Sequence, residues 1–357
     1  MRLSAALCLV VATTLTVLAG QVPAGANRDD ALLEFAVAGS ESCGTGPCWS
    51  KVMAQPRAQR LLLAMAEAPR SAADVDAALA GTGVTRRDLE RLRLIRASSK
   101  GYLPSFPLFR ARDVLRVREV ADRYARALAD AVLRARVEIE DALALYPDPA
   151  ARGDVAFIVL GCFSLDWDGL TLSLERGYRH KPADRPDGRY DPWAMERVPS
   201  ENGTRYWSSA SSWHPTFAVV VFGDGSPATL PAIASDELAK ALLASRAGGF
   251  AVPNSRGTLV LASRDRPMIQ RLLGIGRRTM DSWLAANYDG LKRELGDAGP
   301  GQWNVPFAET FTALWHEVFG RANAHLVEAG LFADPHAEGR AQRGHVAAVF
   351  DPVVLKK

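Results

Sequence analysis

Residues 70–106 read RSAADVDAALAGTGVTRRDLERLRLIRASSKGYLPSF, and local signals in this stretch predict a compact helical unit. Ser71 and Asp74 have the spacing of an N-terminal cap, in which side chains of the first turn satisfy backbone amides. Gly81 and Gly83 follow the apolar positions of that helix, and glycine is typical of the turn after a helix. The sequence therefore predicts a short helix that begins after Ser71 and ends in a glycine turn.

Two further helices and a hairpin are predicted around this turn. Residues 57–68 carry apolar side chains at helical spacing, and Pro69 ends that run. Thr85 can cap a third helix, over 86–95, whose apolar side chains face inward. Gly101 lies at the centre of the next stretch, as in the turn of a two-stranded hairpin. The predicted order is helix, helix, helix and hairpin.

This order of elements over residues 56–110 resembles the winged-helix domains of bacterial transcription regulators. In that family the third helix lies in the major groove of DNA, so the resemblance implies that Arg86, Arg87 and Arg91 contact the nucleic acid. Residues 51–118 hold fourteen Lys and Arg against six Asp and Glu, although the formal net charge of the whole chain is only +3. Such a concentration is typical of a phosphate-binding surface, and also of a solvated helix face in an arginine-rich protein.

The first 26 residues predict export. Arg2 is followed by an apolar run over 3–20 and by small residues at Ala24 and Ala26, which are the three parts of a secretory signal in order. The apolar run is at the short limit for a membrane span and no basic cluster follows it, so cleavage near Ala26 is favoured over anchoring. The mature chain is then expected to begin at Asn27, in the periplasm or outside the cell.

A different translation start would reverse this prediction. If translation begins at Met53, the product is cytoplasmic, and the basic module can belong to a DNA-binding regulator with a C-terminal sensor domain. Chance rarely supplies all three parts of an export signal in order, so export is preferred. The module is then expected to have the winged-helix shape without the DNA role, because a fold does not dictate a function.

Three cysteines remain after the predicted cleavage. Cys43 and Cys48 flank a Gly/Pro turn in the N-terminal segment 27–55, where a small disulfide loop could close in an oxidising compartment. A metal site would need two further ligands nearby, and the sequence offers none, so no metal is predicted. Cys162 lies in an apolar run and is expected to be a small core residue.

Residues 111–146 predict a long amphipathic helix without Gly or Pro. Two roles fit such a helix equally well. In winged-helix regulators a helix in this place often builds a homodimer, whereas packing along the following domain needs no second copy. The apolar stripe recurs at spacings of three and four and consists of Val114, Val117, Ala121, Tyr124, Leu128 and Ala131.

Residues 153–350 predict a mixed α+β domain with a helical C-terminal third. The apolar runs 155–165 and 216–222 are short and rich in branched residues, which is typical of buried strands. Between Pro306 and Gly330 the apolar residues follow a helical stripe. Strands interrupted by helices indicate an α+β class rather than a regular doubly wound sheet.

A ligand site is predicted in the irregular stretch 176–215. Loops of this length are often functional, and aromatic rings interleaved with arginines suit stacking and cation–π contact. The strand end expected after residue 165 would bring two carboxylates into the same cleft. The alternative is that the rings staple an irregular core. The candidate residues are Trp193, Trp207, Trp213, His180, Arg205, His214, Asp166 and Asp168.

No motif in the chain names a reaction. The sequence lacks a Gly-x-Ser-x-Gly elbow, a P-loop, a dinucleotide glycine fingerprint and the His-Glu-x-x-His spacing. No catalytic residue and no cofactor are therefore predicted. The leading hypothesis is an exported, non-catalytic binding or interaction protein whose partner is a protein or a small molecule. The second is the cytoplasmic regulator, and the third is an exported hydrolase or transferase with an unfamiliar site.

Overall fold

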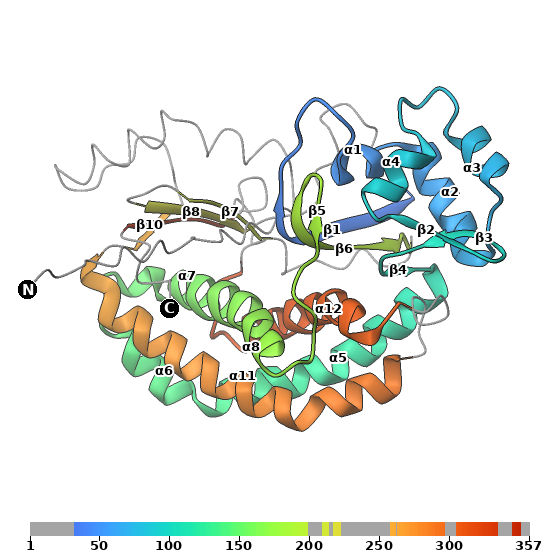
Figure 1. Cartoon of the computed structure of the whole chain (residues 1–357). Helices are drawn as coiled ribbons and strands as arrows, with labels where there is room; N and C mark the ends of the chain where they lie inside the picture. The colour runs from blue at the N-terminus through green and yellow to red at the C-terminus, as the bar shows by residue number, and fades with distance from the viewer. Residues whose placement is uncertain are drawn as a thin grey trace, which may run out of the picture.

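The protein is a mixed α+β structure, seen in a computed structural model. A layer of helices lies beneath two larger sheets, and a small helical module with a hairpin adjoins one of these sheets (Figure 1). The predicted α+β class is confirmed. The predicted export signal, residues 1–26, lies outside the described residues. Those residues are 32–198, 209–213, 217–222, 258–261, 263–296, 305–334 and 345–350, with only the backbone described for 209–213, 217–222, 258–260, 263 and 345–350.

The N-terminal module has its helices and hairpin in the predicted order. Ser71 Oγ accepts a hydrogen bond from the Asp74 amide (3.1 Å), and the Asp74 carboxylate accepts one from the Ser71 amide (3.2 Å). Thr85 and Asp88 cap the third helix in the same reciprocal way. The resemblance of this module to winged-helix domains stays a prediction. The elements are α1 (Trp49–Met53), α2 (Pro56–Glu67), α3 (Ala72–Leu79), α4 (Arg86–Arg91), β2 (Ile95–Ser98) and β3 (Gly101–Pro104).

The sheet next to the module joins distant parts of the chain. Strand β1 (Leu33–Glu41) pairs antiparallel with β6 (Gly188–Glu196) over the full length of both strands. Strand β4 (Leu108–Phe109) pairs parallel with β6. Strand β5 (Asp184–Arg185) pairs antiparallel with the first two residues of β6. The sequence places segment 27–55 apart from the α+β domain, and the structure differs. Backbone hydrogen bonds join the two, because β1 pairs with the whole length of β6, which also pairs with β4 and β5.

The two faces of this sheet belong to two different cores. Phe35 and Val37 of β1 point into the core of the module, whereas Ala36 between them points into the helical layer. In β6, Tyr190 faces the module and Trp193 faces the helices. Alternation of this kind follows from the strand period of two. The β1–β6 pair is therefore a wall shared by both cores.

The helix predicted over 111–146 is formed as two helices. The first, α5 (Ala111–Arg134), is followed by α6 (Arg136–Leu143) after a break at Ala135. Its apolar stripe is covered by two helices of the same chain, α11 (Arg266–Leu295) and α12 (Phe307–Glu328). Of the two roles left open by the sequence, packing along the following domain is the one that the structure contains, and dimer formation stays a prediction.

The prediction of a strand over 155–165 is wrong. These residues lie in a continuous helical segment made of α7 (Arg152–Ala156), a π-helical stretch (Phe157–Asp168) and α8 (Gly169–Glu175). The stretch is buried on every side, so it has no polar face to give a helical period, and a short apolar run cannot be assigned by periodicity alone. Cys162 is buried in it, as expected.

The same segment has one further property. Among the described residues, the helix over Pro149–Glu175 is the one long and apolar enough to cross a membrane. Most of it is buried inside the protein, between α11 and α12. Its apolar character is therefore explained by its place in the helical core.

The second large sheet has the order β7–β8–β10–β9. The strand predicted over 216–222 is formed as β8, and α12 begins after Pro306 and ends before Gly330, whose φ is +68°. Short 3₁₀ turns precede α7 and α11 at Pro149–Ala151 and Ser263–Asp265. The strands of this sheet are β7 (Ser209–Trp213), β8 (Phe217–Phe222), β9 (Thr258–Leu261) and β10 (His345–Phe350).

Candidate ligand-binding cleft

The predicted ligand residues do not form one site. Trp193 is only 3% exposed and packs in the helical core, with its ring centroid 4.5 Å from that of His316. Asp166 is fully buried and Asp168 half-buried, because the segment expected to be a strand with an open end is a core helix. For these three residues the alternative, an aromatic-stapled core, describes the structure.

The remaining candidates divide into two groups. Arg205, Trp207 and His214 lie outside the described residues, and for Trp213 only the backbone in β7 is described. His180 is exposed and lines a cleft, which makes it the one candidate that the described structure places at an open site.

Asp166 belongs to a polar group inside the helical core. Its Oδ1 lies 3.8 Å from His316 Nε2, and the other ring nitrogen of His316 lies 2.7 Å from the carbonyl oxygen of Thr312. Burial lowers the pKa of His316 to about 4. This histidine is therefore neutral at physiological pH and orders the core rather than meeting solvent.

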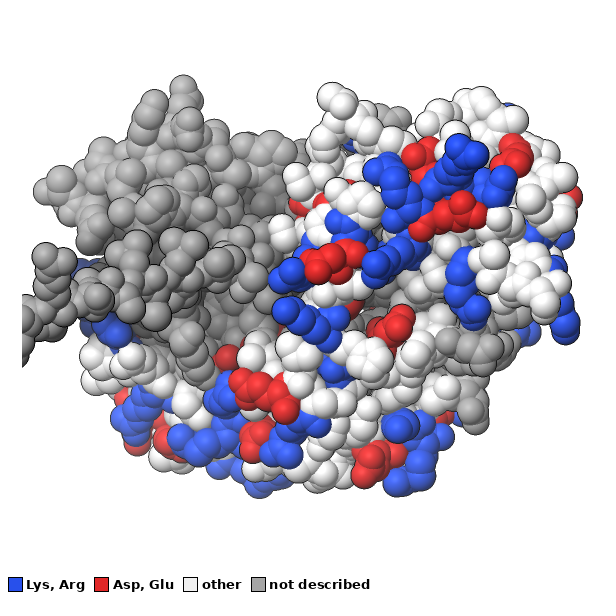
Figure 2. Space-filling model, viewed as in Figure 1, with Lys and Arg blue, Asp and Glu red and all other residues white. Residues whose placement is uncertain are grey.

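A cleft of about 470 Å³ lies where the module meets β6 and α12. One wall comes from α4, β2 and the segment after β3, and the other from the loop before β5 and from β6. Figure 2 shows basic and acidic side chains crowded together over α4 and β5, which border this cleft. Its charged lining residues are Glu90, Arg93, Arg96, Lys181, Arg185, Asp191 and Glu309.

Two carboxylates of the cleft are held by cations that do not line it. Asp191 accepts a hydrogen bond from Arg179 (3.1 Å) and one from the hydroxyl of Thr312 (3.3 Å). Glu90 pairs with Arg86 one helical turn earlier (3.4 Å). The negative charge of both groups is therefore countered from behind, which leaves one further carboxylate, Glu309, against the four cations of the lining.

Arg185 fastens the two walls of the cleft together. Its guanidinium donates to the carbonyl oxygens of Leu92 and Arg93 at the C-terminus of α4, and lies over the Tyr190 ring at 5.1 Å. A cation at a helix C-terminus satisfies carbonyls that have no partner within the helix. Arg185 is thus used in the structure of the cleft and positions Arg93 beside it.

Asp191 makes protein stability depend on pH in a defined direction. Burial raises the pKa of its carboxyl to about 6, against the opposing effect of Arg179. Because the folded-state pKa lies above the usual 3.8, its contribution to stability is present below about pH 4 and is lost as pH rises through about 6. We expect Asp191→Asn to remove this loss of stability between pH 4 and pH 7. The free energy of unfolding in urea, measured for wild type and variant at pH 4, 5, 6 and 7, checks this.

The comparison has to be made between the two proteins, because His316 acts in the opposite sense. Its lowered pKa contributes stability that is lost as pH falls from about 6.5 to about 4. This effect is common to wild type and variant and cancels in the difference. Identical pH profiles for the two proteins would show that Asp191 titrates normally.

The basic side chains of α4 are largely paired within the module. Arg86 contacts Asp76 (3.1 Å) and Glu90 and donates to the hydroxyl of Tyr102 (2.7 Å). Arg91 lies 3.4 Å from Asp88. Of the three arginines predicted for nucleic acid, two therefore have a carboxylate in contact, which weakens the field that a phosphate backbone would meet.

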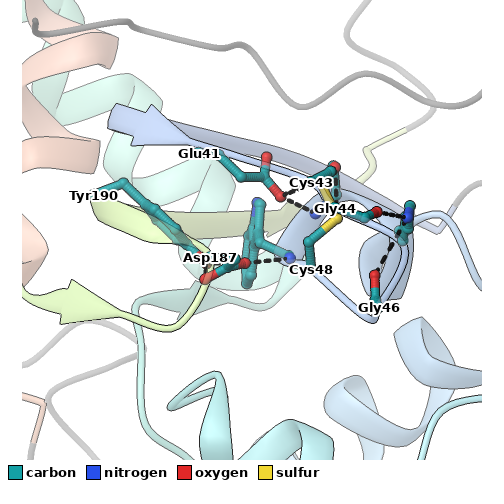
Figure 3. Close-up of a disulfide and its surroundings, with 10 residues drawn as sticks. Glu41, Cys43, Gly44, Gly46, Cys48, Asp187 and Tyr190 are labelled. Carbon is teal, nitrogen blue, oxygen red and sulfur yellow. Dashed lines mark hydrogen bonds between the residues drawn. A yellow bond between two sulfur atoms is a disulfide. The ribbon is translucent and has the colours of Figure 1, made fainter.

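The two cysteines of the N-terminal segment form a disulfide beside the sheet (Figure 3). Glu41 accepts hydrogen bonds from the amide (2.8 Å) and hydroxyl (3.1 Å) of Ser50, while Lys51 donates to two carbonyls of the loop. Next to it, Asp187 accepts from the Trp49 amide and the Tyr190 hydroxyl, both at 2.8 Å. The loop between Cys43 and Cys48 is thereby tied to the module and to β6.

The cleft was not predicted as a whole, because it is assembled from three separate stretches of chain. The sequence indicates His180 by its place among aromatic residues, and no sequence signal joins it to the end of α4. Comparison of the chain with protein-family models, with curated proteins and with solved structures finds no match.

Proposed function

We propose that this protein is exported and binds a small ligand in the cleft between the module and β6, without catalysing a reaction. The observation that carries the proposal is the cleft itself. It is bounded by two parts of the chain with separate cores, and it combines two half-buried carboxylates with cations at an open face. Ligand sites are typically concave, lie between structural units and contain a few converging polar groups.

The polar groups of the cleft suit binding better than nucleophilic catalysis. Ser105 is a hydroxyl residue in its lining, and its hydroxyl donates to the carbonyl oxygen of Arg93 (2.8 Å). A nucleophilic serine instead needs its proton directed at a general base. The side chain of Ser105 therefore supports the wall of the cleft and the conformation of Arg93.

The disulfide supports the export part of the proposal. Disulfides persist in oxidising compartments and are rare in the cytoplasm. The loop from Cys43 to Cys48 lies between β1 and α1, which both belong to the core of the module. The paired arginines of α4 agree with this part, because they disfavour the cytoplasmic DNA-binding alternative.

Filling the cleft tests the binding function. Ala183 lines it and is half-buried, so Ala183→Trp should block it without disturbing a core. We expect at least one of phenyl phosphate, benzoate, benzylamine and benzyl alcohol to shift amide resonances of the cleft in the protein from Asn27, and none to do so in the variant. Ala127→Trp, at an exposed position of α5, is the matched control and should bind as wild type does. Absence of any shift in wild type would overturn the proposal.

The disulfide and export are tested together. In cells producing the full chain, the protein should occur outside the cytoplasm, begin at Asn27 and resist alkylation at Cys43 and Cys48 until it is reduced. Its unfolding free energy should fall by roughly 2 kcal/mol on replacing Cys43 and Cys48 by Ser, as expected for closure of a short loop. Cys162→Ser, at a buried cysteine outside the disulfide, shows whether loss of a cysteine alone has this effect. A sequence-specific DNA complex formed by a cytoplasmic product would favour the regulator instead.

A further inference from the structure

We propose that the ligand of the cleft is a small organic anion, carrying a carboxylate or phosphate group, and that Arg93 is the residue that selects it. This inference rests on the proposed binding function and adds the chemical class of the ligand. It is carried by the backbone of Arg93, by the charges around it and by the apolar part of the lining.

Arg93 has a backbone conformation that normally requires glycine. Its φ is +54°, and it is the one non-glycine residue with positive φ in the described part of the chain. It follows α4, where its amide donates to the Glu90 carbonyl (2.9 Å) and the Leu94 amide donates to the Leu89 carbonyl (2.8 Å). This is the pattern of a helix end in which glycine is the usual residue at this position. An arginine there costs free energy that glycine would not.

Strain of this kind is found where a side chain has a function. Arg93 lines the cleft, and its side chain is exposed there. Within the described residues no hydrogen bond or ion pair holds this side chain. Its charge acts at longer range on Asp184, since the pKa of that carboxyl is lowered first by Arg189 and further by Lys181 and Arg93. A bound anion would supply the direct contact that the described residues do not.

The neighbouring charges leave the cleft positive at Arg93. Lys181 lines the opposite wall and, within the described residues, is likewise without an ion pair. Glu90 and Asp191 are countered by arginines outside the lining, and the third carboxylate, Glu309, faces four cations that line the same cleft. Asp184, on the strand beside the cleft, is paired with Arg189 at 2.5 Å. An anion placed between Arg93 and Lys181 meets two cations without displacing an existing pair.

The remaining lining is apolar enough to contact more than an inorganic ion. Ile95, Phe106, Pro107 and Pro192 contribute to the cleft. Contact with such groups is gained only by a ligand that carries carbon alongside its anionic group. We therefore infer an organic carboxylate or phosphate of small size.

Replacing Arg93 by glycine tests the proposal in two independent measurements. Because glycine relieves the strain, Arg93→Gly should raise the melting temperature by about 2 °C. Because the guanidinium is lost, the dissociation constant for phenyl phosphate, followed by amide shifts, should rise about tenfold or more. Arg93→Lys keeps a positive charge and should bind more tightly than Arg93→Gly.

A matched control is available two residues earlier. Arg91 is exposed in the last turn of α4, so Arg91→Gly should lower the melting temperature and leave the affinity for phenyl phosphate unchanged. Comparison of Arg91→Gly with Arg93→Gly therefore distinguishes the effect of losing any arginine near the cleft from the effect of losing the one with the strained backbone.

The outcomes distinguish this inference from the proposed function. Binding of benzylamine in preference to phenyl phosphate, abolished by Ala183→Trp, would leave the binding function in place and overturn the anion class. Inorganic phosphate binding as tightly as phenyl phosphate would overturn the organic class. Unchanged affinity in Arg93→Gly would overturn the role of Arg93, and failure of every probe to bind would overturn both proposals.

Discussion

A chain that begins at Met53 is expected not to fold. It lacks β1 and Trp49, and it therefore removes large buried side chains from the core of the module, among them Leu33, Phe35 and Val37. Burial of each large apolar side chain contributes about 1.5–3 kcal/mol. Their summed loss is comparable with the whole free energy of unfolding of a typical domain, about 5–15 kcal/mol.

The truncation also removes a carboxylate that pairs with a buried arginine in the core of the helical layer. Arg118 of α5 is only 5% exposed, and it pairs with Glu34 of β1 at 3.0 Å and with Glu317 of α12 at 3.6 Å. Without Glu34 this buried guanidinium loses one of its carboxylates, and breaking a buried pair is strongly destabilising. The loss of β1 thus affects both cores.

Amide spectra and near-ultraviolet circular dichroism measure this prediction. The chain from Asn27 should give dispersed resonances and a cooperative unfolding transition, and the chain from Met53 should give neither. Removing residues 1–26 alone is the control for the effect of shortening the chain. A folded, soluble product from Met53 would restore the cytoplasmic regulator as a working hypothesis.

Replacing Trp193 by alanine is expected to destabilise the protein by roughly 3–5 kcal/mol, the cost of a large cavity in a core. The ring packs in the helical layer against His316, and β6 holds it opposite α12. Trp193 lies on the same face of β6 as Asp191 but is not among the residues that line the cleft, so binding of phenyl phosphate should persist in the folded variant. The large effect is on stability, not on affinity.

Urea unfolding and amide shifts together decide the role of Trp193. Leu115→Ala is a matched control, since Leu115 is a large apolar residue that is 47% exposed on α5, and its loss should cost less than about 0.5 kcal/mol. A Trp193→Ala variant of wild-type stability that no longer bound phenyl phosphate would return this ring to the ligand site.

Local signals in the sequence predicted the local structure well. The caps of α3 and α4 consist of Ser71 with Asp74 and Thr85 with Asp88, and both are formed by residues three apart. The hairpin at Gly101 depends on one residue whose φ of +122° suits glycine. Features of this kind can be predicted because all of their atoms come from a few consecutive residues.

Features that depend on distant residues could not be predicted in the same way. The helix over 152–175 packs against α11 and α12, which are distant in the sequence. Because its central stretch is buried on every side, its own sequence carries no helical period of polar and apolar residues. The pairing of β1 with β6 leaves no mark in either strand that names its partner. The cleft depends on this pairing, since β6 supplies Asp191 to a wall that α4 faces, and Arg93 could be singled out only once its backbone conformation was known.

The wall shared by the two cores also sets the order in which the protein can mature. Residues 33–41 reach their partner strand only after residues 188–196 have been synthesised or have crossed a membrane. Until then the early helices lack one side of their core, and loop closure over so long a separation is slow. The export that we propose would need such a delay, because a chain that folds too early cannot cross a membrane in an extended state. The late synthesis of β6 delays folding by topology alone, so we expect the first half of the polypeptide to remain open to proteases until its second half follows.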